Sequence, residues 1–282
     1  MMTDSASPVA LQRIFHPTDF SPGSQVAFAH ALKLALLARA ELTIMHVDPT
    51  VTPEGFEDFP RVRPTLEKWG ALPEGSTKEQ VASLGLRIKK IRALANDPKA
   101  ALLHHLTQSP SDLMVLSTHP HEGRFHWIHE PESEVVSRAA QVTTLFVPSH
   151  VEGFVSLEDG RTALHRILLP ISRDPSPVRS IHIATTLASL AGSDKITFEL
   201  AHSGDSEGLP PVPMPEHPGW SWHTIVGDGN AVDWILASGA EYDVDLIVMA
   251  TKGHDSLLDS LLGSTTERVL HGARCPVLAI PA

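Results

Sequence analysis

The residues best suited to binding a ligand lie in the last part of the chain, between residues 245 and 281. An apolar run at residues 246–250, typical of a buried parallel strand, leads into a loop that contains Gly253. Gly263 follows, and Ser264 after it is a residue of the type that begins helices. A glycine-bearing turn that leads into a helix leaves backbone N–H groups free, and the helix dipole adds positive potential there. This stretch therefore predicts an anion site, most often one for a phosphate.

The strand, turn and helix that form this pattern occur twice in the chain. Residues 116–148 align without a gap on residues 249–281, with matching residues such as Glu134 and Glu267. Apolar runs alternate with amphipathic segments in both copies, which indicates parallel sheets joined by right-handed crossovers. We expect two α/β domains that pack together as an intramolecular pseudo-dimer. Their predicted bounds are residues 1–150 and 165–282, separated by a linker or hairpin at residues 151–164.

Local signals place the other elements. Ser21-Pro22 predicts the start of a helix that runs to about Arg39, and Asp174-Pro175 predicts the start of its counterpart in the second copy. Residues 203–219, rich in proline and glycine, predict a loop where the first copy has helical sequence. The expected strands lie at residues 13–17, 42–47, 87–94, 113–116 and 143–147 in the first copy, and at 166–170, 196–201, 222–226, 246–250 and 277–280 in the second.

Composition narrows the class of protein. The formal net charge of −11 and the pI near 5.8 argue against a nucleic-acid-binding surface. No apolar run approaches the roughly 18–20 residues that span a bilayer, and the polar first residues do not resemble a signal peptide. Cys275 has no second cysteine with which to form an internal disulfide. We therefore expect a cytoplasmic protein that binds neither nucleic acid nor membrane.

These motifs together resemble the universal stress protein family, over nearly the whole chain. The resemblance rests on the strand end Pro17-Thr18-Asp19, on His46-Val47, on the strand DLIVM that begins at Asp245, and on the closing CPVLAI that begins at Cys275. The nucleotide-binding branch of that family has Gly-x-x-Gly, nine residues and Gly-Ser/Thr. The second copy has Ala250-Thr-Lys-Gly253, nine residues and Gly263-Ser264, with alanine in place of the first glycine.

The resemblance implies two Rossmann-like domains of the adenine nucleotide alpha hydrolase type, each with a mainly parallel five-stranded sheet and flanking helices. It also implies a stress-response sensor or regulator that binds ATP or AMP in the second domain, with Mg²⁺ as a companion of ATP. General α/β geometry also places a ligand at the carboxyl ends of the strands. The residues implied for the site are Pro170, Ile171, Ser172, Met249, Ala250, Lys252, Gly253, Gly263, Ser264 and Thr265.

The first copy keeps a different part of the family pattern. Thr18 and Asp19 stand where the family has its acidic residue, whereas the second copy has Ser172 there. At the glycine positions the first copy has Glu130, which repels phosphate, and Pro131, which lacks a backbone donor. Thr18 and Asp19 are therefore interpreted as a vestigial site, or as residues that begin the following helix.

Two other hypotheses concern function, and a third concerns assembly. The chain could be a structural or interaction protein of the same fold that binds no nucleotide. It could respond to a metal through a histidine-rich loop in the first copy. Two chains could also pair into a homodimer.

No phosphate-binding P-loop, Gly-x-Ser-x-Gly or His-Glu-x-x-His motif is present, so we expect no enzyme and at most slow, incidental ATP hydrolysis. The weak candidate metal ligands are His119, His121, His126 and His129.

Overall fold

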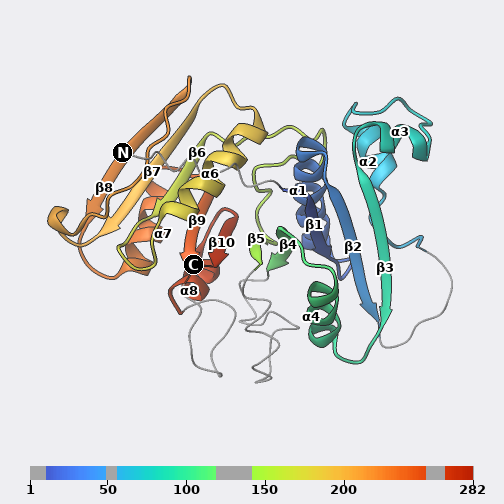
Figure 1. Cartoon of the computed structure of the whole chain (residues 1–282), viewed down its shortest axis with the longest axis horizontal. Coiled ribbons are helices and arrows are strands. Elements are labelled where there is room, and N and C mark those ends of the chain that lie inside the picture. Colours follow the sequence, from blue (N-terminus) through green and yellow to red (C-terminus); the bar gives the residue numbers. More distant parts are fainter. Residues whose placement is uncertain (1–10, 49–55, 119–141, 252–263, 282) are drawn as a thin grey trace.

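The described strands form one twisted sheet with helices on both faces (Figure 1). The computed structural model describes residues 11–48, 56–118, 142–251 and 264–281. The described strands follow the order β3-β2-β1-β4-β5-β10-β9-β6-β7-β8 in one ten-stranded sheet. Each half of that order is one copy of the sequence repeat. Within each half every neighbouring pair of strands is parallel.

The first half follows the predicted alternation of strands and helices closely. Helix α1 begins at Pro22 because Ser21 caps it, with its side chain accepting a hydrogen bond from the backbone N–H of Ser24. It ends at Arg39, which is in the left-handed conformation. The described elements are β1 (Arg13–Pro17), α1 (Pro22–Ala38), β2 (Glu41–Asp48), α2 (Val62–Lys68), α3 (Lys78–Ser83), β3 (Arg87–Leu94), α4 (Pro98–Gln108), β4 (Leu113–Thr118) and β5 (Thr143–Pro148).

The second half repeats this plan with fewer helices. The Pro/Gly-rich segment after β7 contains only a short 3-10 helix, η1 (Ser206–Gly208), where the first half has α2 and α3. The helix after the first strand begins at Val178, later than Asp174-Pro175 predicts, and Pro177 at its N-cap position offers no side-chain acceptor. The elements are β6 (Arg166–Pro170), α6 (Val178–Ala191), β7 (Ile196–Ser203), β8 (Trp220–Gly227), α7 (Ala231–Glu241), β9 (Leu246–Thr251), α8 (Ser264–Gly272) and β10 (Val277–Pro281).

The two halves join through the closing strands of the repeat. β5 and β10 pair antiparallel, with Leu145 opposite Leu278 at the centre of the contact. Both leucines are fully buried. The core cluster between the sheet and helices α1 and α6 contains residues of both halves, including Ile14 and Ile167. Buried apolar residues of both halves therefore pack together in one cluster across the join.

A hairpin between β5 and β6 also connects the halves. Val155 and Thr162 form an antiparallel bridge, and the Trp69 indole N–H donates to the Leu157 carbonyl at 3.3 Å. Nε2 of the buried His30 accepts hydrogen bonds from the backbone N–H groups of Phe154 and Val155, at 3.1 and 3.2 Å. On the other side, Thr162 donates to a backbone carbonyl at the end of α6. The hairpin therefore contacts helices of both halves.

A pair of equivalent carboxylates fixes the amino ends of the strands. Oδ2 of Asp112 accepts from the backbone N–H groups of Gln12 and Arg13, both at 2.8 Å. Oδ2 of Asp245 accepts in the same way from His165 and Arg166, at 2.7 and 2.8 Å. Asp112 and Asp245 occupy the same position in the aligned copies. This repeated contact ties the strand that follows each aspartate to the first strand of its half.

Candidate functional site

In the second half the ladder between two neighbouring strands ends at the place where α/β proteins bind ligands. β6 and β9 pair at Ile167 with Leu246 and at Leu168 with Ile247, and the described ladder between them ends there. Beyond that point the described residues of the two strands no longer pair, and this unpaired stretch is called the opening below. Because the strand order reverses between β6 and β9, this is the topological switch point at which such folds place a ligand.

The predicted residues on β6 form one side of this opening. Pro170 ends the strand and Ile171 after it is buried. The Ile171 N–H donates to the Ala201 carbonyl at 2.8 Å, and its own carbonyl accepts from Nδ1 of His202 at 3.2 Å. Ser172 is half-buried, and its hydroxyl donates to the Pro175 carbonyl at 3.4 Å. The backbone of Ile171 is thus occupied by the neighbouring strand, and Ser172 begins the exposed part of the edge.

The predicted residues on β9 form the other side. Met249 packs its side chain in the core cluster under α7 and α8, so it offers a ligand only backbone groups. Ala250 is half-buried near the strand end, and the Thr251 hydroxyl donates to the Ile280 carbonyl at 3.4 Å. Thr251 therefore joins the carboxyl ends of β9 and β10.

The phosphate part of the predicted site is only partly covered by the structure. Ser264 is the first residue of α8, and Thr265 is exposed in its first turn. The N-terminus of that helix follows the carboxyl end of β9 in the chain, as the sequence pattern predicts. Lys252, Gly253 and Gly263 lie outside the described residues, as do Glu130, Pro131 and the candidate metal ligands His119, His121, His126 and His129.

The equivalent edge of the first half is built differently. The Thr18 hydroxyl contacts the Ser24 hydroxyl at 2.9 Å and accepts from the Phe20 N–H at 3.2 Å. Oδ1 of Asp19 accepts from the N–H of Ser21, the residue that caps α1. Thr18 and Asp19 therefore take part in the turn that begins α1.

An aromatic group packs at the carboxyl ends of β1 and β2. Phe20 stacks on His46 with ring centres 4.0 Å apart, and its edge meets Phe59 at 5.4 Å. Nδ1 of His46 donates to the Thr18 carbonyl at 2.7 Å, which repeats the contact of His202 with Ile171. Phe20 has φ 63, a left-handed conformation that costs a bulky residue on the order of 1–3 kcal/mol. The ring contacts compensate for that strain by packing Phe20 against its neighbours.

His16, to which no sequence motif pointed, lies at the first-half switch point. Its Nδ1 donates to the Val115 carbonyl at 2.9 Å, across the place where the ladder between β1 and β4 ends. Complete burial lowers the pKa of His16 to about 4, although the bond to Val115 and the charge of Asp19 act in the opposite direction. The ring is therefore neutral at pH 7, and Nε2 has no hydrogen-bond partner within the described part of the chain.

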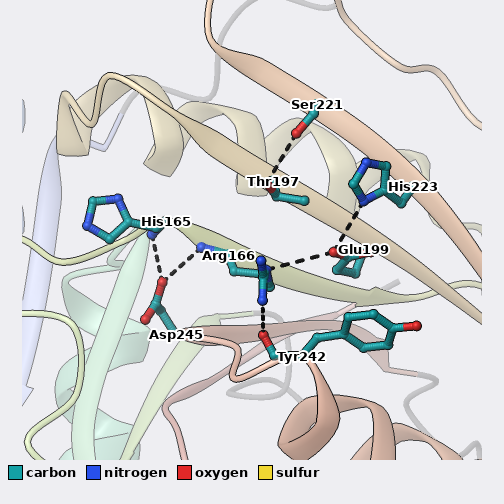
Figure 2. Close-up of polar contacts among 8 residues, drawn as sticks. All are labelled: His165, Arg166, Thr197, Glu199, Ser221, His223, Tyr242 and Asp245. Carbon is teal, nitrogen blue, oxygen red and sulfur yellow. Dashed lines mark hydrogen bonds and ion pairs between the residues drawn. The ribbon is translucent and has the colours of Figure 1, made fainter.

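Figure 2 shows a second polar group that the sequence analysis did not select, on β6, β7 and β8. Oε1 of Glu199 lies 3.8 Å from Nε of Arg166 and 3.4 Å from Nδ1 of His223. The Glu199 side chain is only 3% exposed, whereas those of Arg166 and His223 are 40% and 60% exposed. Arg166 also donates from Nη1 to the Tyr242 carbonyl. Since Arg166 is the first residue of β6, this group lies away from the carboxyl edge and is not part of the candidate site.

The one cysteine and the described groups of possible metal ligands are considered next. Burial raises the pKa of the Cys275 thiol to about 12, so the cysteine is unreactive at neutral pH. No three His, Cys, Asp or Glu residues within the described ranges lie together as metal ligands would. Helices in the described part of the chain are too short or too polar to cross a bilayer.

Comparison with known proteins agrees with the sequence resemblance. The model of the universal stress protein family matches residues 10–148 and 172–281. A universal stress protein of Methanocaldococcus jannaschii is 38% identical over 90 residues, which make up 32% of this chain and 53% of that protein. Universal stress protein A homolog 2 of Coxiella burnetii is 45% identical over 58 residues, 21% of this chain and 39% of that protein. The chain thus spans about half or less of the curated relatives that it matches.

Solved structures agree in fold over nearly the full chain. A universal stress protein from Archaeoglobus fulgidus has a TM-score of 0.57 at 17% identity and covers 97% of this chain and 98% of its own. A functionally unknown protein from Pseudomonas aeruginosa has a TM-score of 0.55 at 13% identity and covers 98% and 95%. At such identities the likeness concerns the fold. It confirms the predicted α/β class with mostly parallel sheets and flanking helices.

Proposed function

The chain belongs to the universal stress protein family, and on that basis we propose that its second half binds an adenine nucleotide, ATP or AMP, between the carboxyl ends of β6 and β9. We propose that the protein is cytosolic. Nucleotide binding at this edge lets it act as a sensor or regulator in a stress response. Mg²⁺ accompanies ATP, held by the phosphates and not by a set of protein ligands.

The observation that carries this proposal is the early end of the ladder between β6 and β9, together with a helix, α8, that begins after β9 in the chain. The ladder ends at Leu168 and Ile247, while β9 continues to Thr251 before the chain reaches α8 at Ser264. An opening between strands accommodates a flat base and sugar, and free N–H groups at a helix start suit phosphate. Gly253 and Gly263 complete the sequence pattern of such a phosphate turn.

The first half supports the choice of the second half by contrast. At its own carboxyl edge the rings of Phe20, His46 and Phe59 pack on one another, the Thr18 hydroxyl contacts the Ser24 hydroxyl, and the Asp19 carboxylate accepts from the Ser21 N–H. A base entering there would have to displace the stacked rings. We therefore propose one nucleotide for each chain.

The direct test is native mass spectrometry of protein purified without added nucleotide, followed by titration calorimetry with ATP and AMP. We expect bound adenine nucleotide in the mass spectrum, or a saturable heat of binding. The absence of both at millimolar ATP would contradict the proposal and favour an interaction protein of the same fold.

A charge substitution tests the placement of the phosphates. Gly263→Glu introduces the residue type that the first copy has at the aligned position, Glu130, and it should abolish binding by placing a carboxylate at the helix start. Ser189→Glu is the matched control, because it adds the same charge at an exposed position in the last turn of α6. Unchanged affinity in the Gly263 variant would refute this placement.

A further inference from the structure

We infer that the second half binds one water molecule between β6, β7 and the last turns of α7, at the buried carboxylate of Glu199. The inference goes beyond the proposed function and does not depend on it, because Arg166 beside Glu199 begins β6 and so lies away from the carboxyl edge. Figure 2 shows Glu199 and Arg166. The third residue of this water site is Ser238 of α7.

The two oxygens of the Glu199 carboxylate differ in their surroundings. Oε1 lies 3.8 Å from Nε of Arg166 and 3.4 Å from Nδ1 of His223. Oε2 is buried and has no hydrogen-bond partner among the residues that the structure describes. Burial of a carboxylate oxygen without a hydrogen bond is strongly destabilising, and such oxygens in folded proteins bind either a protein donor or ordered water. A hydrogen-bond donor at Oε2 is therefore required.

Arg166 does not supply that donor. Its Nη1 donates to the Tyr242 carbonyl, and its Nε lies 3.8 Å from Oε1 of Glu199, which is beyond hydrogen-bond distance. Nε is also buried, with no acceptor in the described part of the chain. A donor and an acceptor of the same ion pair are thus both unmatched. One water can match them, because it accepts from Nε and donates to Oε2.

α7 places the hydroxyl of Ser238 opposite Glu199. Val232 and Ile235 of this helix share a core cluster with Ala201 of β7. From Ile235 to Ser238 the helix advances about 4.5 Å, and from Ala201 back to Glu199 the strand covers about 6.6 Å. Both steps lead the same way, because α7 runs from the end of β8 back to the start of β9.

Ser238 contributes a third unmatched polar atom. Its side chain is fully buried, and its Oγ has no hydrogen-bond partner within the described ranges. A serine inside a helix often donates to the carbonyl four residues earlier, and no such bond forms here. A buried water needs two to four polar partners. Glu199, Arg166 and Ser238 provide three, from two strands and one helix.

The first half shows that the fold does not require these groups. Thr43 has the position of Glu199 in the strand register, and the counterpart of Ser238 in α4 is His105, whose ring packs on Phe15. Neither Thr43 nor His105 has a buried polar atom that lacks a partner. The need for a bound water thus arises with the buried carboxylate of the second half.

The direct test is a crystal structure of the full chain at a resolution that shows ordered water. We expect density for one water within about 3 Å of Oε2 of Glu199, in contact also with Nε of Arg166 or Oγ of Ser238. The same water should be missing in crystals of Glu199→Met, which has no acceptor there. A direct bond from a protein donor to Oε2, or no density beside Oε2, would overturn the inference.

A second test measures the coupling through the water in solution. Ser238→Ala should raise the equilibrium constant for urea unfolding by about tenfold, because it removes one partner of the water while the carboxylate stays buried. In a Glu199→Met background the same change should alter that constant by less than about threefold.

Ser180→Ala is the matched control for this measurement. The Ser180 Oγ is also buried and without a partner in the described residues, but it belongs to α6 on the other face of the sheet. Its effect should be the same with Glu199 and with Met at that position. If Ser238→Ala also had equal effects in both backgrounds, the inferred link between Ser238 and Glu199 would be overturned.

Discussion

Leu145 on β5 lies directly opposite Leu278 on β10, and the two leucines hold the same position in the aligned copies. On either side of them, Phe146 is opposite Val277 and Thr144 is opposite Ala279. Such an exchange of equivalent residues is what a two-fold axis between the leucines produces. The halves therefore contact each other as the subunits of a symmetric dimer do, within one chain.

The leucine pair should be energetically coupled. Leu145→Ala and Leu278→Ala should each lower the free energy of unfolding by about 2–5 kcal/mol, because each leaves a cavity in a fully buried contact. The double variant should differ from the sum by about 0.5–3 kcal/mol. Urea unfolding measures all three values. The control combines Leu145→Ala with Leu42→Ala on β2, and the losses of unfolding free energy from those two changes should add. Additive losses for Leu145→Ala and Leu278→Ala would contradict direct contact between the two leucines.

Stability should fall in acid because of two buried histidines. Burial lowers the pKa values of His16 and His30 to about 4, below the usual value of 6.5. Above pH 6.5 both rings are neutral in the folded and the unfolded chain, so the stability is fully present there. As the pH falls from 6.5 through 4, the unfolded chain binds protons that the folded chain excludes, and stability is lost. The loss amounts to about 3 kcal/mol for each ring. Protonated His30 could also no longer accept the bonds from Phe154 and Val155.

His30→Gln should remove one of these two contributions. Its amide oxygen can still accept a hydrogen bond but does not titrate in this range. Urea unfolding at several pH values from 7 to 4 should show a smaller dependence of stability on pH for this variant than for the wild type. His104→Gln, at an exposed position of α4, serves as the control and should leave the dependence unchanged. If the stability of all three proteins depended equally on pH, His30 would bind a proton as readily in the folded chain as in the unfolded chain.

The two equivalent aspartates should contribute similarly to stability. Asp112→Ala and Asp245→Ala each remove a carboxylate oxygen that accepts two backbone hydrogen bonds. We expect each change to lower the free energy of unfolding by about 2 kcal/mol, and the Asn variants by about half as much. Chemical unfolding curves test this. A loss below about 0.5 kcal/mol at both positions would mean that water replaces the carboxylates without cost.

Arg166 should matter mainly because Glu199 is buried beside it (Figure 2). Arg166→Met should cost about 2–3 kcal/mol, since it leaves a buried carboxylate without its cation. In a Glu199→Gln background the same change should cost less than about 1 kcal/mol. Arg13→Met is the control from the first half, where the strand register places Thr43 at the position of Glu199. Equal costs of Arg166→Met in both backgrounds would exclude coupling between the two side chains.

Most of the fold could be predicted because the repeat made each element visible twice. The strands RIFHP and RILLP, and the helix start at Ser21-Pro22, were predicted from local patterns that the structure confirms. The later start of α6 at Val178 was missed, because Asp174-Pro175 looks like a cap and its neighbours are not helical. The pairing of β5 with β10 could not be predicted either, since the sequence of an edge strand does not specify which other edge it pairs with.

The candidate site was predicted in part, from the strand ends and the glycine spacing. His16, His30 and Glu199 were not found, because their roles depend on burial and on partners far away in the chain. A polar residue inside an otherwise apolar run, such as Glu199 in β7, is the signal that could have drawn attention to one of them.

The antiparallel join of β5 and β10 has a consequence for how the two halves could diverge. In a homodimer built from one copy, a substitution at one ligand edge is necessarily made at the other as well. A covalently joined pair has no such constraint, so Gly263 in the second copy did not require a glycine at the aligned Glu130 of the first. The edges of the two halves can therefore differ in sequence, and the shared sheet holds both in a fixed ratio of one to one.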